Sequence, residues 1–273
     1  MLRSLDVSDR PGIAVAVTLT FVAAIAVRAS AADDPLSRAR VLYNQHQYEA
    51  AVNAAEQARL TRSRADAADL IAARAYLERF RSSAASDDLT NARERLRRID
   101  PQGFDPRTRL EYIVGLGEAL YLDGAYGAAT TIFESVLLGQ DLLTGEARDR
   151  VLDWWADTVD RDARGRPAGI ADRGALYQRI RSRMEDEIAS HPADASAAYW
   201  LAAAARGQGD VQAAWDAVEA AWARAPLARN RSALRADLDQ LMTQGIIPER
   251  ARALSQPPAQ LVADWERFKE RWK

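Results

Sequence analysis

Apolar residues recur along this chain at the spacing of α-helices, and runs that alternate apolar and polar residues are nearly absent. Four large apolar residues near the C-terminus stand at i, i+4, i+7 and i+11: Leu261, Trp265, Phe268 and Trp272. That spacing places them on one helix face, because an α-helix turns once in 3.6 residues. Leu234, Leu238 and Leu241 mark a second amphipathic helix. The pattern predicts an all-α fold.

Three segments share one further pattern, in which a turn is followed by small or apolar residues at fixed intervals. The clearest segment contains Leu116-Gly117, Gly124, Tyr126, Ala129, Phe133 and Val136. The second contains Leu201, Gly209, Val211, Ala214, Val218, Ala221 and Pro226. The third contains Tyr48, Ala51, Ala55 and Ala58, after a helical stretch over 36–45. Such repetition predicts stacked helix–turn–helix units.

This pattern resembles the tetratricopeptide repeat, a family of 34-residue helix–turn–helix units. In that family glycine ends the first helix, a small alanine lets the second approach closely, and an aromatic residue fills the gap to the next unit. The segment around Gly124 matches in full, and the one around Gly209 lacks only the aromatic. The resemblance spans roughly residues 35–227. It implies a right-handed α-solenoid of about five helix pairs, with a concave groove and no activity of its own.

The intervals between the three segments each leave room for one more, degenerate unit with an insertion. We expect the first to comprise a helix over 64–80, a polar stretch over 81–88 and a helix over 89–99. We expect the second to comprise a helix over 146–162, a helix breaker over 163–169 and a long helix over 170–190. The repeat domain would then occupy residues 32–227.

The pattern changes after Pro226, where a different role is expected. Gly245 should stop the helix that carries the three leucines, and Pro248 can open a short helix after it. Solenoids need atypical end units that cover their exposed apolar face. We therefore predict that residues 228–273 form helical caps. The alternative is that the last helix binds a partner.

The N-terminus has the form of a secretory signal peptide. An uncharged apolar core over 13–27 is followed by Ala29-Ser30-Ala31, so cleavage is predicted after Ala31. Asp6 and Asp9 offset the nearby arginines, and this leaves two alternatives: an uncleaved anchor, although 13–27 is at or below the usual spanning length, or a buried helix. Residues 1–31 are thus a signal peptide or an anchor. The folded part would be periplasmic or secreted, or held outside the cytoplasm at the inner membrane.

Composition limits the partners. The net charge is −2, so the chain lacks the excess of basic residues that nucleic-acid binding requires. The chain has no cysteine, so a disulfide-linked partner, a thiolate metal site and a lipid-modified cysteine are excluded. Its 48% hydrophobic and 28% charged residues are an ordinary globular balance and argue against disorder.

Patterns typical of catalysis are missing from the sequence. His46 and His191 are the two histidines, and they show no metal-ligand spacing, so turn residues are the expected role. No phosphate loop, nucleophile elbow or dinucleotide fingerprint occurs. Gly115 and Gly117 lie within an expected helix and are interpreted as packing positions. We expect no enzyme activity, no cofactor and no metal.

The first helix of each pair lines the concave face in the family that the repeats resemble. Candidate groove residues are therefore Glu118, Tyr121, Trp154, Trp155, Tyr199 and Arg206. Adjacent helical residues lie about 100° apart, so one of Trp154 and Trp155 should pack in the core while the other is exposed or lines the groove. For each aromatic residue, packing between neighbouring units is the alternative.

Together these features favour a non-enzymatic scaffold or adaptor of a bacterial cell envelope. It would present its groove to a peptide or protein partner whose identity the sequence does not reveal. The alternative is an envelope protein that binds a glycan or a small molecule through an aromatic groove.

Overall fold

The computed structural model describes residues 34–139, 143, 145–167 and 171–273. Within these ranges the chain is helical and contains no β-strand, which confirms the expected all-α class. The predicted signal peptide or anchor, residues 1–31 with the core 13–27, lies outside the described residues.

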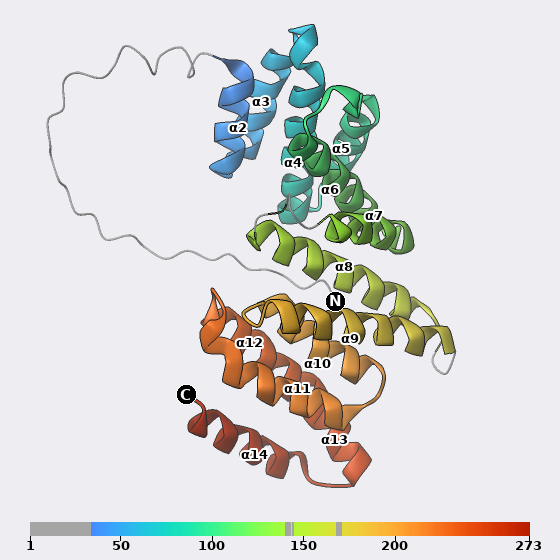
Figure 1. The fold of residues 1–273 in the computed structure, drawn as a ribbon, viewed down its shortest axis with the longest axis vertical. Helices are drawn as coiled ribbons and strands as arrows, with labels where there is room; N and C mark the ends of the chain where they lie inside the picture. The colour runs from blue at the N-terminus through green and yellow to red at the C-terminus, as the bar shows by residue number, and fades with distance from the viewer. Residues whose placement is uncertain (1–33, 140–142, 144, 168–170) are drawn as a thin grey trace, which may run out of the picture.

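Consecutive helices pack against one another along the whole chain. From the N-terminus they pair as α2 (Pro35–Asn44) with α3 (Tyr48–Arg59), α4 (Ala65–Ser83) with α5 (Ser86–Arg98), α6 (Pro106–Leu122) with α7 (Tyr126–Leu138), α8 (Gly145–Gly165) with α9 (Ala171–Ser190), and α10 (Ala195–Gly207) with α11 (Val211–Arg224). The remaining helices are α12 (Arg231–Leu241), α13 (Ile247–Leu254) and α14 (Pro258–Arg271). Figure 1 shows the pairs following one another along the long axis, from α2 at one end to α14 at the other.

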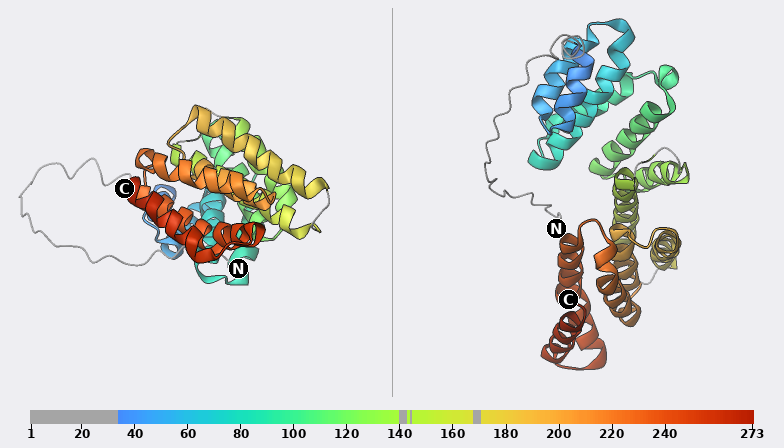
Figure 2. Two further views of the ribbon diagram at one scale, coloured as in Figure 1. Left: turned by 90° about the horizontal axis from the view of Figure 1, so that it is seen from below. Right: turned by 60° about the vertical axis from the view of Figure 1, so that its left-hand side comes forward.

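The first helices of successive pairs also contact each other. α2 packs on α4, α4 on α6, α8 on α10, and α10 on α12. Of the first helices that the structure describes, α6 and α8 are the neighbours without such a close contact. The right-hand view in Figure 2 shows the same progression of helices from the N-terminal to the C-terminal end.

Three of the turns inside the pairs share one backbone geometry. His46, Gly124 and Gly209 have φ angles of 60°, 79° and 84°, and each stands two residues before its second helix. The next N–H donates to the carbonyl five residues earlier, in the bonds Gln47 to Leu42, Ala125 to Leu120 and Asp210 to Ala205. This is the bonding of a left-handed helix C-cap, which favours glycine and which histidine tolerates better than most residues. The expectation that His46 is a turn residue is confirmed.

The second helices of these three pairs carry alanine at the same place. Ala51, Ala129 and Ala214 are each the fourth residue of their helix, and each is 0% exposed. A methyl group adds little bulk, so both helices of a pair can approach closely at this point. The same packing therefore occurs in three separate pairs.

Gly117 is a packing position, as the sequence predicts. A Cβ atom there would lie 2.6 Å from Cε1 of Phe133, so α6 carries no side chain where this ring packs. The Phe133 ring also lies 5.7 Å, centroid to centroid, from that of Trp154 on α8. One aromatic residue thus fills the space between its own pair and the next.

The two degenerate pairs exist, but their connections are shorter than expected. The polar stretch predicted over 81–88 is helical except at Ala84 and Ala85. Ala84 ends α4 with φ 54° and donates its N–H to the carbonyl of Phe80 at 2.7 Å, so this turn forms without glycine. The predicted breaker over 163–169 is also too long, because α8 continues to Gly165. Most polar residues in both stretches are exposed on helix surfaces, whereas Asp88 is 3% exposed and pairs with Arg79 at 3.2 Å.

The expectation that Gly245 stops a helix is wrong. The chain stays helical from Arg231 to Leu254, through a π-helical turn, η5 (Met242–Ile246). A Cβ atom on Gly245 would lie 2.6 Å from the Arg206 guanidinium carbon, so glycine here admits a side chain from α10. The wider π-turn comes directly before Pro248, which has no N–H to donate to a regular helix.

The apolar stripe expected on the last helix is largely buried. Leu261, Trp265 and Phe268 are at most 8% exposed, whereas Trp272 is 52% exposed. Trp265 packs edge-on against Trp222 of α11, with ring centroids 5.1 Å apart. The C-terminal helices therefore share one hydrophobic cluster with α10 and α11.

Candidate functional site: a pocket between α4, α6 and α8

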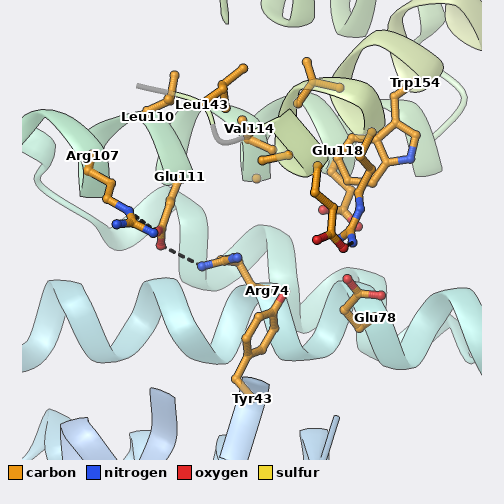
Figure 3. Close-up of a pocket in the computed structure, with 15 residues that line it drawn as sticks. Tyr43, Arg74, Glu78, Arg107, Leu110, Glu111, Val114, Glu118, Leu143 and Trp154 are labelled. Carbon is orange, nitrogen blue, oxygen red and sulfur yellow. Dashed lines mark hydrogen bonds and ion pairs between the residues drawn. The ribbon is translucent and has the colours of Figure 1, made fainter. Parts of the chain in front are cut away.

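A pocket opens where α6 and α8 lack close contact. It has a volume of about 240 Å³ and is lined by α4, α6 and α8, with Tyr43 from α2 and Leu143 from the segment before α8. Figure 3 shows these side chains converging from different helices. All of the lining helices are first helices of their pairs, so the pocket belongs to one layer of the fold.

Helical spacing explains why each helix contributes several side chains. Residues four apart lie on the same face of a helix, and the lining residues follow this interval. They include Arg74 and Glu78 on α4, Val114 and Glu118 on α6, and Glu146, Arg150 and Trp154 on α8. One face of each first helix is thus turned toward the pocket.

The pocket has an apolar side and a charged side. Leu110, Val114 and Leu143 lie together on the apolar side, with Trp154 farther along (Figure 3). Across from them, Arg74 bonds Glu111 through Nη1 and Oε2 at 2.6 Å and lies 4.6 Å from the centre of the Tyr43 ring. Burial raises the pKa of Tyr43 to about 12, so this hydroxyl stays neutral. Arg74 is therefore fixed between α2 and α6.

The inner end of the pocket is acidic. The Glu118 side chain is only 7% exposed, and its Oε1 lies 3.1 Å from Nε of Arg81. The ion pair lacks hydrogen-bond geometry, and among the described residues no donor satisfies Oε1. Burial raises the pKa of Glu118, although the nearby Arg81 charge acts in the opposite direction. Glu78 points toward Glu118 from α4 (Figure 3).

The ring of Trp154 forms a wall of the pocket and is itself largely covered. The Arg81 guanidinium carbon lies 4.3 Å from the ring centre, and Phe133 packs against the ring as well. The residue is 9% exposed. A sugar ring that stacks on an aromatic face would need a bare face, and Trp154 does not offer one.

The pocket brings together two of the six candidate groove residues, Glu118 and Trp154. Tyr121 lies near them but not in the lining. Its hydroxyl donates to Oδ2 of Asp157 on α8 at 2.5 Å, and Arg161 lies 5.4 Å from its ring centre. Tyr121 thus ties α6 to α8 beside the pocket.

The other three candidates lie away from the pocket, in packing positions. Trp155 is 2% exposed in the core, and Tyr199 packs edge-on against Trp200 with ring centroids 5.5 Å apart. Arg206 donates from Nε and Nη2 to one carboxylate oxygen of Glu249, at 3.0 and 2.7 Å. Arg206 therefore joins α10 to α13.

Sequence reasoning missed the α4 side of the pocket, Arg74 and Glu78. A signal was present, because Arg74 interrupts the apolar run from Leu70 to Leu77 and Glu78 follows it at helical spacing. A charged residue in such a run needs a partner. The partner of Arg74 is Glu111, 37 residues away, and no local pattern reveals it.

The described residues contain no group of histidine, aspartate and glutamate side chains that could hold a metal ion. None of their helices is long and apolar enough to cross a bilayer. No family model matches the chain, and no curated protein or solved structure matches it. The site is therefore interpreted from its own geometry.

Proposed function

We propose that this chain is an exported scaffold or adaptor without enzyme activity, whose groove binds a segment of a peptide or protein partner. Its helix pairs would form a right-handed, tetratricopeptide-like α-solenoid closed by the C-terminal helices. The recurring turn at His46, Gly124 and Gly209 supports this assignment. So do the buried alanines that follow each of these turns at one spacing.

The pocket between α4, α6 and α8 is the observation that carries the proposal. It lies on the layer of first helices, the layer that lines the groove in the family that the repeats resemble. Its volume of about 240 Å³ is below the roughly 300–1,000 Å³ of pockets that enclose a whole small ligand. A pocket of this size suits one or two side chains of a peptide whose backbone runs outside.

The rim of the pocket also suits a polypeptide. The side chains of Arg107, Glu146 and Arg150 are each more than half exposed, and charges of both signs stand side by side. Exposed charges of this kind add little affinity but select and orient a partner. The glycan alternative has less support, because the Trp154 ring is covered and Trp155 is buried.

Site-specific crosslinking tests the proposal, since the chain has no cysteine of its own. A single cysteine at Arg107 would carry a photoreactive group at the pocket rim, where the native side chain is 74% exposed. Leu138, 71% exposed at the end of α7, provides the control on a second helix. Irradiation in envelope extracts should give a discrete protein adduct with Arg107→Cys and none with Leu138→Cys.

Equal labelling at both positions, or no adduct at the rim, would remove the main support for a peptide-binding groove. A pocket-filling variant sharpens the result. Val114→Trp should abolish the adduct at Arg107→Cys without changing the helical circular dichroism spectrum, because Val114 is only partly buried.

Export has a separate test. Mass analysis of the mature protein should show a chain that begins at Ala32. An intact Met1 in the membrane fraction would favour the anchor over residues 13–27. A full-length chain recovered from the soluble cytoplasmic fraction would contradict export in either form.

A further inference from the structure

The inner end of the pocket has more negative than positive charge. Glu78 and Glu118 both pair with Arg81, whose guanidinium lies 3.7 Å from the first carboxylate and 3.1 Å from the second. Oε1 of Glu118 is buried and has no hydrogen-bond partner among the described residues, and the Glu78 carboxylate lies 3.7 Å from Arg81, beyond hydrogen-bond distance. Arg74 and Arg150 also act on Glu118 through their charges, but Arg81 is the cation that both carboxylates share.

The other arginines near the pocket already have partners. Arg74 is held by Glu111 at 2.6 Å, and Arg150 lies 3.8 Å from Glu146 at the exposed rim. Burying a carboxylate without a hydrogen-bonding partner is unfavourable. A ligand that brings a positive charge and hydrogen-bond donors to Glu118 would remove this cost.

We propose that this pocket receives a lysine side chain of the partner, with its ammonium group between Glu78 and Glu118. The proposal rests on the function proposed above and names the side chain that the groove recognises. The four methylene groups of lysine would lie along Leu110 and Val114, which line the apolar side. The pocket then matches both halves of the side chain, an apolar stem and a charged tip.

The pocket favours lysine over the other candidate side chains. An ammonium group carries three donors on a compact centre, so it can bridge two carboxylates. A guanidinium group binds well when it stacks on an aromatic face, but Arg81 already occupies that position on Trp154 at 4.3 Å. An aspartate or glutamate would meet two like charges at the inner end.

A displayed library of random dodecapeptides, selected against the full-length protein, tests the assignment. Lysine should be enriched at one position of the selected peptides. In the best synthetic peptide, N-acetylation of that lysine should weaken binding roughly tenfold or more, because it removes the charge and two donors. Replacement by arginine should also weaken binding.

Substitutions of the two glutamates in the protein should weaken binding of the lysine peptide in the same way. Glu118→Gln keeps the shape of the side chain but removes its charge. It should weaken binding of the lysine peptide roughly tenfold and change binding of the acetylated peptide little. Glu78→Gln should act in the same direction and serves as the main variant if Glu118→Gln fails to fold. Glu94→Gln on α5, where the native side chain is 49% exposed and outside the pocket lining, is the control and should change binding less than about twofold.

The outcomes separate the two proposals. Suppose that Val114→Trp excludes the selected peptides, but that these peptides bind without a lysine or tolerate its acetylation. This result would overturn the lysine assignment and leave the groove function standing. Selection of no peptide, or of peptides that neither Val114→Trp nor Leu110→Trp excludes, would overturn both. Loss of binding below the raised pKa of Glu118 would add support, since protonation removes the charge that attracts the ammonium group.

Discussion

The two ends of the molecule are packed with different side chains. In the N-terminal region, α2 to α5, most buried residues are alanines, with a few leucine, isoleucine and valine side chains. In the C-terminal region, α8 to α14, alanines remain but tryptophans are added: Trp154, Trp155, Trp200, Trp215, Trp222 and Trp265. All seven tryptophans of the chain lie in or beyond α8.

The pocket lies where the two regions meet. The first helices α2, α4 and α6 contact one another on its N-terminal side, and α8, α10 and α12 do so on its C-terminal side. Between α6 and α8 this close contact is missing, and the pocket opens there.

The largest loss of stability is expected from a substitution that leaves a cavity in the C-terminal core. Trp265 is 0% exposed, stacks on Phe268 with centroids 5.6 Å apart, and donates Nε1–H to Asp239 at 2.8 Å. Trp265→Ala should destabilise the protein by about 3–5 kcal/mol, because it leaves a large cavity. Urea denaturation followed by circular dichroism measures the loss.

Trp272→Ala is the matched control for this prediction. Trp272 is 52% exposed, so its removal should change the free energy of unfolding by less than about 0.5 kcal/mol. Equal losses for the two variants would show that ring packing does not hold the C-terminal region together.

In the alanine-packed region, enlarging a buried side chain should destabilise the protein. Ala51 is 0% exposed, where α3 approaches its neighbours. Ala51→Leu should cost about 1–3 kcal/mol, because the added carbons have no space and the helices must separate. Asn53→Leu, on the exposed side of the same helix, adds a similar volume to the surface. If Ala51→Leu were as stable as that control, close packing on alanine would be disproved.

The features that the sequence predicts well are local ones. The turns at Gly124 and Gly209 and the buried stripe of α14 depend on residues within about one helical turn of each other. The turn at Ala84 was predicted only as part of a longer polar stretch over 81–88, because its left-handed residue is not glycine. The role of Gly245 was misjudged because the side chain that needs its space, Arg206, belongs to another helix pair.

The site was predicted only in part, for the same reason. Glu118 and Trp154 were found because the resemblance places them on first helices. Arg74 and Glu78 were missed, since their place in the pocket depends on how α4 faces α6, and the contact between Arg74 and Glu111 spans 37 residues. Pocket geometry follows from packing between pairs, and periodicity within one helix does not specify it.

Two helix-capping aspartates, Asp194 and Asp105, differ in their surroundings. Asp194 caps α10, accepting from the Ala197 N–H at 2.9 Å, and burial raises its pKa to about 6, with Asp149 and Glu187 adding to the effect. Asp105 caps α6 at the surface, and the hydroxyl of Thr108 lowers its pKa. The charge on Asp194 is therefore unfavourable, whereas the charge on Asp105 is favourable.

Asp194→Asn should thus stabilise the protein at neutral pH by about 1–2 kcal/mol, because asparagine caps a helix nearly as well without the buried charge. A folded-state pKa above the unfolded value means that the native state binds the extra proton. The penalty is full above about pH 6 and vanishes below about pH 4, so the gain should disappear as the pH falls through that window. Asp105→Asn should destabilise the protein at neutral pH, and this loss of stability should shrink at low pH. Thermal unfolding at several pH values would contradict this if both variants shifted in the same direction.

The smallest expected change in stability concerns two glycines on α6, the helix between the two regions. A Cβ atom on Gly117 would lie 2.6 Å from the buried Phe133 ring, whereas one on Gly115 would meet only Leu96, at 3.4 Å. Alanine is better than glycine in a helix by about 1 kcal/mol. Gly115→Ala should therefore stabilise the protein slightly, while Gly117→Ala should destabilise it by about 1 kcal/mol, because the clash outweighs this gain. Since Phe133 packs on Trp154, Gly117→Ala should also change the tryptophan fluorescence. Equal stabilisation by both variants would show that Phe133 can move freely, and that the wall of the pocket is not fixed by α6.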